Sequence, residues 1–148
     1  MTGTLEDKTV LVVGRGGGIA GAVTLAARDA GAQVIAAGRD QGVLGAVYGG
    51  EPGISTESVD LTDEASIAAP GGRLGTVDHV VSTASARARG RIADLDRDAI
   101  RLSFDTKVTG PLMLAEPWPP HERGRVVHPV LRRRSGEDRG RHDGRGHH

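Results

Sequence analysis

The sequence predicts an α/β fold built on a doubly wound parallel sheet of four or five strands, and two observations support this prediction. Short apolar runs alternate along the chain with segments of helical spacing, which is typical of parallel strands joined by crossover helices. Glycine-rich turns follow the early apolar runs, which indicates a ligand cleft at the carboxyl ends of the strands. This regular alternation stops after about residue 115.

The predicted strands are short runs rich in β-branched residues, and the predicted helices lie between them. Strands are expected over 9–13, 33–37, 56–61 and 77–81. Helices are expected over 19–30, 41–48, 62–69 and 95–115. Thr62 is the expected N-cap of the third helix, and Pro111 should kink or interrupt the fourth.

The chain divides into two parts of different composition. We expect a Rossmann-like dinucleotide-binding domain over 1–116 and a tail over 117–148. Pro, Arg, Gly and His dominate the tail, which has too few large apolar side chains to offset the entropy lost on ordering. The tail is therefore expected to be disordered, with room for one short strand near 125–130.

The composition excludes several classes of protein and site. The chain has 148 residues, zero formal net charge and no cysteine, so disulfides and zinc–thiolate sites are excluded. No apolar run approaches the roughly 20 residues of a membrane span, and the first residues lack the apolar core of a signal peptide. We therefore expect a cytoplasmic protein with no membrane or nucleic-acid partner. His142, His147 and His148 are interpreted as a solvated terminus, and no metal site is predicted.

The glycine turn between the first strand and the first helix points to a ligand class. Gly14 permits a tight exit from the strand, Gly18 lets the helix backbone approach a ligand, and Ala20 is small enough for helix–strand packing. Bare backbone N–H groups and a helix N-terminus would then converge on one point, where a pyrophosphate could be held. The alternative is a flexible glycine-rich loop with no ligand.

The end of the second strand predicts which dinucleotide is bound. An acidic residue there would accept hydrogen bonds from the adenosine ribose, but this chain has Gly38 followed by Arg39. The Arg39 guanidinium, with Arg15 nearby, could pair with a 2′-phosphate, which favours NADP over NAD. NAD stays an alternative because Asp40 adjoins Arg39, and Arg39 could instead be a solvated surface charge.

Four segments together resemble the short-chain dehydrogenase/reductase family. Residues 14–20 (Gly-Arg-Gly-Gly-Gly-Ile-Ala) resemble its Gly-x-x-x-Gly-Ile-Gly fingerprint, and residues 59–63 resemble the segment whose Asp contacts adenine. Residues 78–85 resemble its fourth strand and Asn-Asn-Ala-Gly turn, and residues 104–111 its Phe-Asp-Val-Asn-Val-x-Gly-Pro helix. The resemblance covers roughly residues 5–115. With the turn and Arg39, it implies these cofactor-binding residues: Gly14, Arg15, Gly16, Gly17, Gly18, Ile19, Arg39, Asp60, Leu61 and Ala84.

The resemblance implies oxidoreduction, with hydride transfer between NADP(H) and a carbonyl or alcohol substrate. The family's catalytic Ser and its Tyr-x-x-x-Lys pair have no identifiable counterpart, because no tyrosine follows Tyr48 and no lysine follows Lys107. Lys107 stands where the family's helix Asn belongs, so its role is left open between a proton donor and a neutral occupant. The alternative function is an NADP(H)-binding relic without turnover, or a partner subunit.

The resemblance also bears on the tail and on assembly. It implies a family member that is truncated or frame-shifted after about residue 115, because a GC-rich gene read in a shifted frame yields Arg, Pro, Gly and His. Family members often pair through the corresponding long helix. We therefore expect a homo-oligomer that pairs through the segment near 98–114.

Overall fold

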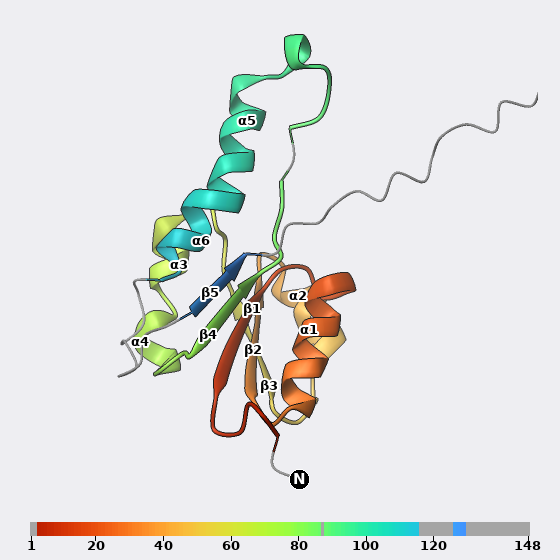
Figure 1. Ribbon diagram of the computed structural model, residues 1–148, viewed down its shortest axis with the longest axis vertical. Coiled ribbons are helices and arrows are strands. Elements are labelled where there is room, and N and C mark those ends of the chain that lie inside the picture. The colour runs from red at the N-terminus through yellow and green to blue at the C-terminus, as the bar shows by residue number, and fades with distance from the viewer. Residues whose placement is uncertain (1–2, 87, 116–125, 130–148) are drawn as a thin grey trace, which may run out of the picture.

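The computed structural model describes residues 3–86, 88–115 and 126–129, the last range by its backbone alone. Five parallel strands form one sheet in the order β3-β2-β1-β4-β5 (Figure 1). The strands are β1 (Thr9–Val13), β2 (Gln33–Gly38), β3 (Ile54–Ser58), β4 (His79–Ser82) and β5 (Val126–Pro129). The predicted parallel α/β fold is confirmed. β5 lies within the range where the sequence left room for one strand, and the rest of the predicted tail lies outside the described residues.

Helices cover both faces of the sheet, as a doubly wound fold requires (Figure 1). One face carries α1 (Gly18–Asp29) and α2 (Gln41–Tyr48). The other face carries α3 (Glu64–Ala68), α4 (Gly71–Leu74) and α6 (Gly110–Met113). Above the sheet, α5 (Arg97–Phe104) and a 3-10 turn (Ile92–Asp94) form an arm that projects from the carboxyl ends of the strands.

The core has a layer on each side of β1, because successive side chains of a strand point to opposite faces. Leu11 and Val13 pack on one side with Val80 and Leu114. Residues of the other layer are Val10, Val12, Ala20, Ala27, Ala32 and Val34. These side chains are short and aliphatic. The buried strand run and the small residues of α1 are therefore what hold the glycine turn in place.

The third strand was predicted over 56–61 but ends earlier, at Ser58. The reason is its neighbour: β2 ends at Gly38, which pairs with Ser58, so the ladder has no partner beyond that point. The chain then turns and places Val59 and Leu61 in the core.

The predicted N-cap at Thr62 is wrong, because Asp63 caps α3 instead. The Asp63 carboxylate accepts from the backbone N–H of Ala65 at 3.1 Å. The Thr62 hydroxyl is engaged elsewhere, since it donates to the Asp60 carboxylate at 2.7 Å. The N-cap side chain must accept a helix N–H, and Asp63, which directly precedes the first helical residue Glu64, is the residue in position to do so.

The fourth strand was predicted over 77–81 but begins at His79. Asp78 stands just before the ladder and clamps its lower end, because its carboxylate accepts from the backbone N–H of Thr9 at 2.8 Å. The N–H of Asp78 donates in turn to the Thr9 carbonyl at 3.0 Å. This pair of bonds joins the first residue of β1 to the chain entering β4.

Replacing Asp78 with alanine should destabilise the fold, because the partly buried N–H of Thr9 would lose its acceptor. The expected loss in the free energy of unfolding is about 1–3 kcal/mol. Asp78→Asn keeps an oxygen acceptor and should lose less. Urea denaturation followed by circular dichroism measures both variants, and unchanged midpoints would show that the clamp contributes nothing.

The helix predicted over 95–115 is interrupted, as expected from Pro111, but the interruption precedes the proline. Residues Asp105–Thr109 form a π-helical turn between α5 and α6. Pro111 lies in the first turn of α6, where its missing N–H is tolerated. The helix is therefore interrupted by the π-helical turn, and Pro111 stands after it at a position that needs no N–H donor.

The apolar stripe of this segment faces outward rather than into the core. Ile100, Phe104, Val108 and Leu112 are 37%, 61%, 47% and 67% exposed. The buried face instead carries Thr106, Gly110 and Leu114 at four-residue spacing. A β-carbon on Gly110 would lie 2.6 Å from the carbonyl oxygen of Leu61, so only glycine permits this close approach.

Candidate dinucleotide-binding cleft

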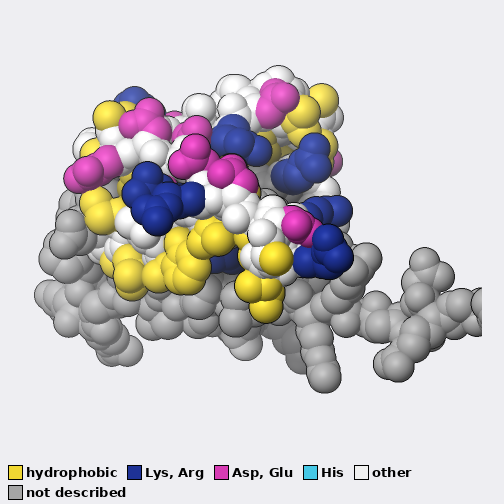
Figure 2. Space-filling model, turned by 90° about the horizontal axis from the view of Figure 1, so that it is seen from above, with side chains coloured by type: hydrophobic (Ala, Val, Ile, Leu, Met, Phe, Trp, Pro, Cys, Tyr) yellow, Lys and Arg dark blue, Asp and Glu magenta, His cyan; other side chains and the backbone are white. Residues whose placement is uncertain are grey.

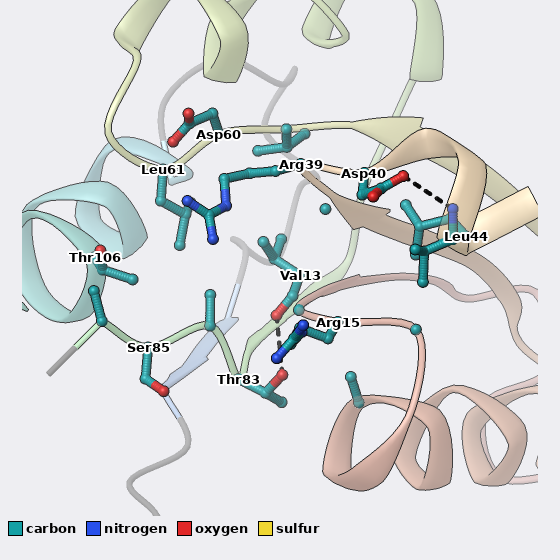
Figure 3. Close-up of a pocket in the computed structure, with 18 of the residues that line it drawn as sticks. Val13, Arg15, Arg39, Asp40, Leu44, Asp60, Leu61, Thr83, Ser85 and Thr106 are labelled. Atoms are coloured by element: carbon teal, nitrogen blue, oxygen red, sulfur yellow. Dashed lines mark hydrogen bonds between the residues drawn. The ribbon is translucent and has the colours of Figure 1, made fainter. Parts of the chain in front are cut away.

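A cleft of about 910 Å³ lies at the carboxyl ends of β1, β2 and β4. Strand order places it at the topological switch point, because the chain moves from β1 outward to β3 and then crosses to β4 on the other side of β1. This is where open α/β sheets bind their ligands. Figure 3 shows side chains from all three strand ends and from the π-helical turn gathered around it.

The glycine turn forms one wall of the cleft and presents bare backbone. Gly17 is the N-cap of α1, where no side chain bonds to the helix's first N–H groups. Gly18 has φ +60°, a conformation that favours glycine. A β-carbon added to Gly17 or Gly18 would meet nothing within 4 Å, so the loop surface faces open space. The N-terminus of this 12-residue helix can therefore receive an anion.

Tight packing fixes the exit from β1 beneath this loop. The Val13 carbonyl accepts from the backbone N–H of Thr83 at 2.8 Å and from its hydroxyl at 3.2 Å (Figure 3). A β-carbon on Gly14 would collide with the Thr83 hydroxyl and would lie 3.0 Å from the Ala20 β-carbon. The close helix–strand contact predicted for Gly14 and Ala20 is thus present.

Asp60 lies at the opening of the cleft beside Leu61 and Arg39 (Figure 3). Its carboxylate accepts from the hydroxyl of Thr62 at 2.7 Å and from the backbone N–H of Thr62 at 2.9 Å. These hydrogen bonds, aided by the charge of Arg39, hold the pKa of Asp60 below its usual value. The residue is therefore an acceptor, held in a fixed orientation, at the edge of the cleft.

Asp40 follows Arg39 but is committed to another role. Its carboxylate accepts from the backbone N–H of Val43 at 3.0 Å and so caps α2. In the part of the chain that the structure describes, the side chain of Arg39 forms no ion pair. Arg39 therefore stands at the end of β2 with its guanidinium available to a ligand.

The opposite end of the cleft is formed by the chain leaving β4 and by the helical segment above it. Ala84, Ser85 and Ala86 line one side, and Thr106 and Lys107 line the other. The Thr106 hydroxyl donates to the Leu102 carbonyl at 2.8 Å, one helical turn earlier. Lys107 is half-buried and is the charged residue at this end of the described cleft.

The structure brings the site residues predicted from the sequence into this one cleft. They are Gly14, Arg15, Gly16, Gly17, Gly18, Ile19, Arg39, Asp60, Leu61 and Ala84, together with Lys107. Sequence reasoning did not single out Thr83, Leu102 or Thr106, which also line it. Thr83 directly follows the fourth strand, and a residue at the carboxyl end of a parallel strand is expected to line the ligand cleft. The others depend on the long helix folding back over β4, which no local pattern reveals.

The surface around the cleft carries both signs of charge. Figure 2, which looks down on the end of the molecule that bears the arm, shows basic and acidic side chains interspersed. Among residues 3–86 and 88–115, no group of three His, Asp or Glu side chains is placed to hold a metal ion. No helix in the described part of the chain has the length and apolar character needed to cross a membrane.

Comparison with known proteins agrees with this geometry. Residues 8–128 match the family model of the short chain dehydrogenases, so the match reaches into β5, past residue 115 where the resemblance seen in the sequence ends. A curated relative, the 2-keto-3-deoxy-L-fuconate dehydrogenase of Xanthomonas campestris pv. campestris, is 36% identical over 70% of this chain and 35% of its own length. A short-chain dehydrogenase/reductase of Pestalotiopsis microspora is 30% identical over 77% of this chain and 42% of its own.

Solved structures give the same result for the fold. A short-chain type dehydrogenase/reductase of Mycobacterium ulcerans superposes with a TM-score of 0.66 and 30% identity, over 76% of this chain and 46% of that one. Its counterpart in Mycobacterium marinum gives a TM-score of 0.69 and 28% identity, over 76% and 49%. The chain thus spans less than half the length of each of these four relatives.

Proposed function

The chain belongs to the short-chain dehydrogenase family, and on that premise we propose that it binds NADP(H) in the cleft and acts as an oxidoreductase on a carbonyl or alcohol substrate. The observation that carries this proposal is the uncapped N-terminus of α1, reached through a glycine turn with open space above Gly17 and Gly18. The residues present fit a dinucleotide, because a pyrophosphate needs bare N–H groups and room close to the backbone.

The two halves of the dinucleotide would lie on opposite sides of β1. The adenosine half would extend toward the end of β2, where Arg39 and Asp60 stand. The nicotinamide half would extend toward β4, between Ala84 and the π-helical turn. Bound NADP(H) supplies the hydride, while this chain orients the cofactor through backbone groups and side-chain contacts.

The preference for NADP(H) over NAD(H) rests on the charges at the end of β2. A 2′-phosphate placed there would meet the guanidinium of Arg39, with Arg15 also lining the cleft. Asp40 is engaged as the helix cap, so it is not held toward a ribose hydroxyl. Both arginines are exposed, so salt should weaken the preference.

A specific observation favours a second candidate, nucleotide binding without turnover. Tyr48 is the chain's one tyrosine, and it is 3% exposed in a core cluster with Ala36 and Leu44, outside the cleft. It therefore cannot serve as the general acid at the nicotinamide end. Lys107 lies there, and it is the side chain with an exchangeable proton that we propose as the donor if turnover occurs.

Turnover and binding can be separated by two measurements, the absorbance at 340 nm and the melting temperature. The purified chain is mixed with NADPH and a panel of ketones. In parallel it is mixed with NADP⁺ and a 2-keto-3-deoxy sugar acid, because the Xanthomonas relative's name makes such an acid the substrate that is oxidised, and there turnover raises the absorbance at 340 nm. Steady loss of absorbance at 340 nm, abolished by Lys107→Ala, supports the oxidoreductase. A raised melting temperature with NADPH but no turnover on any ketone supports the binding-only candidate.

We also propose that two copies pair through the apolar stripe of the segment near 98–114. Phe104 and Leu112 are more than half exposed, and large exposed apolar side chains that follow one another on a helix indicate an interaction surface. Phe104→Glu combined with Leu112→Glu should shift the mass in solution from dimer to monomer. Ile92→Glu is the matched control, because Ile92 is 91% exposed but lies on the tip of the arm. Light scattering measures the mass, and a monomeric parent chain would contradict the proposal.

The cytoplasmic location of the protein stays a prediction.

A further inference from the structure

Ser103 on α5 joins two walls of the cleft at the nicotinamide end. Its hydroxyl donates to the Ala86 carbonyl at 2.8 Å, and its oxygen accepts from the backbone N–H of Ala88 at 2.7 Å. Both bonds are short, partly buried and made between residues at least 15 positions apart in the chain. One side chain thus satisfies a donor and an acceptor of a segment that has no regular secondary structure of its own.

The segment held in this way is a wall of the cleft. β4 ends at Ser82, and the backbone N–H of Thr83 donates to the Val13 carbonyl. Ala84, Ser85 and Ala86 then line the cleft beyond the end of β4. Ala84 packs against the core, and further along this wall the two bonds of Ser103 tie Ala86 and Ala88 to α5.

The anchoring helix forms the facing wall. Leu102 precedes Ser103, and Thr106 and Lys107 follow it within one helical turn, and these three residues line the cleft. Ser103 also lies at the base of the arm, where the chain that left β4 returns to the body of the molecule (Figure 1). The two bonds of Ser103 therefore help to set the spacing between the two walls.

We propose that Ser103 is a positioning residue for the nicotinamide half of the dinucleotide, an inference that rests on the proposed function. Ser103 does not touch the cofactor. It holds the backbone at Ala86 and Ala88 at a fixed distance from the π-helical turn, so the wall is ordered before the ligand arrives. Binding then loses less conformational entropy, and the hydride-bearing ring has one orientation.

The position of Ser103 predicts an effect confined to one half of the ligand. Arg39 and Asp60 follow β2 and β3, on the other side of β1 from β4 and the wall that Ser103 holds. Ser103→Ala should therefore weaken binding of NADP⁺, whose nicotinamide half meets the loosened wall. It should leave binding of adenosine 2′,5′-bisphosphate unchanged, since that ligand has the adenosine half and the 2′-phosphate alone.

The test is isothermal titration of the whole chain and its variants with these two ligands. Loss of two ordinary hydrogen bonds corresponds to about a tenfold weaker Kd for NADP⁺ in Ser103→Ala. The bisphosphate Kd should be unchanged, and Ser103→Thr should restore the NADP⁺ value because it keeps the hydroxyl. Hydrogen exchange of residues 84–88 should be faster in Ser103→Ala alone.

The outcomes separate the inference from its premise. An equal loss of affinity for both ligands in Ser103→Ala would mean that the serine only supports the fold. No loss of affinity for either ligand would mean that its two hydrogen bonds do not position the nicotinamide half. Either result overturns the inference and leaves the proposed function standing. Failure of the parent chain to bind either ligand would overturn the proposed function and the inference with it.

Discussion

Gly38→Ala is expected to unfold the chain at a much lower denaturant concentration and to abolish NADP(H) binding. A β-carbon at this position would lie 2.5 Å from the carbonyl oxygen of Gly14 and 3.6 Å from its carbonyl carbon. Both atoms belong to the backbone, so no side-chain rotation relieves the collision. The strand ends of β1 and β2 must separate, and we expect a cost of about 3 kcal/mol, at the upper end of ordinary overpacking.

The same movement would disrupt the site, because Gly14 begins the glycine turn and Arg39 follows Gly38 directly. Gly45→Ala is the matched control, since Gly45 lies inside α2 and a β-carbon there would meet nothing within 4 Å. Alanine is the better helix former, so this control should be neutral or stabilising by up to about 1 kcal/mol. Urea denaturation measures both variants. Equal midpoints would show that β1 and β2 do not approach each other as described.

Arg39→Ala is expected to weaken NADPH binding by about tenfold at low salt while leaving NADH binding unchanged. A charge-assisted hydrogen bond to the 2′-phosphate contributes about 1.5–3 kcal/mol. The exposure of the guanidinium to solvent and salt places the effect at the lower end of that range. NADH has no phosphate at that position and loses nothing. The variant also removes the positive charge that helps to lower the pKa of Asp60. That carboxylate stays ionised at neutral pH, because its main stabilisation comes from Thr62.

The control for this charge change is Arg73→Ala. Arg73 bonds to Glu57 at 2.9 Å on the outside of the sheet and does not line the cleft. The Arg73→Ala substitution removes one positive charge from the chain without altering the site, so both nucleotides should bind as before. Titration calorimetry at two salt concentrations reads the result. Equal losses for NADPH and NADH in Arg39→Ala would contradict the assignment of the 2′-phosphate to Arg39.

Much of the fold and site could be predicted because their signals are local. The run Thr9–Val13 is a buried strand, and the glycines after it indicate a turn in which Gly14 packs closely against Thr83 and Ala20. Arg39 is recognisable because it follows directly after a strand end. These patterns depend on residues adjacent in sequence, and the structure places the predicted residues in one cleft.

The parts that could not be predicted depend on contacts between distant segments. Thr62 looked like a helix cap until the position of Asp60 was known, and the buried face of 95–115 is set by the packing of Gly110 against Leu61. Ser103 carried no signal, because its two partners lie 17 and 15 residues earlier in the chain.

Calorimetric titration of the folded chain with NADPH, and separately with NADH, tests the central claim most directly. Backbone N–H groups at the start of α1, with Arg39 beside them, should bind NADPH with a Kd in the micromolar range, about tenfold tighter than NADH. A chain that remains folded and gives no heat with either nucleotide at millimolar concentration would contradict the account.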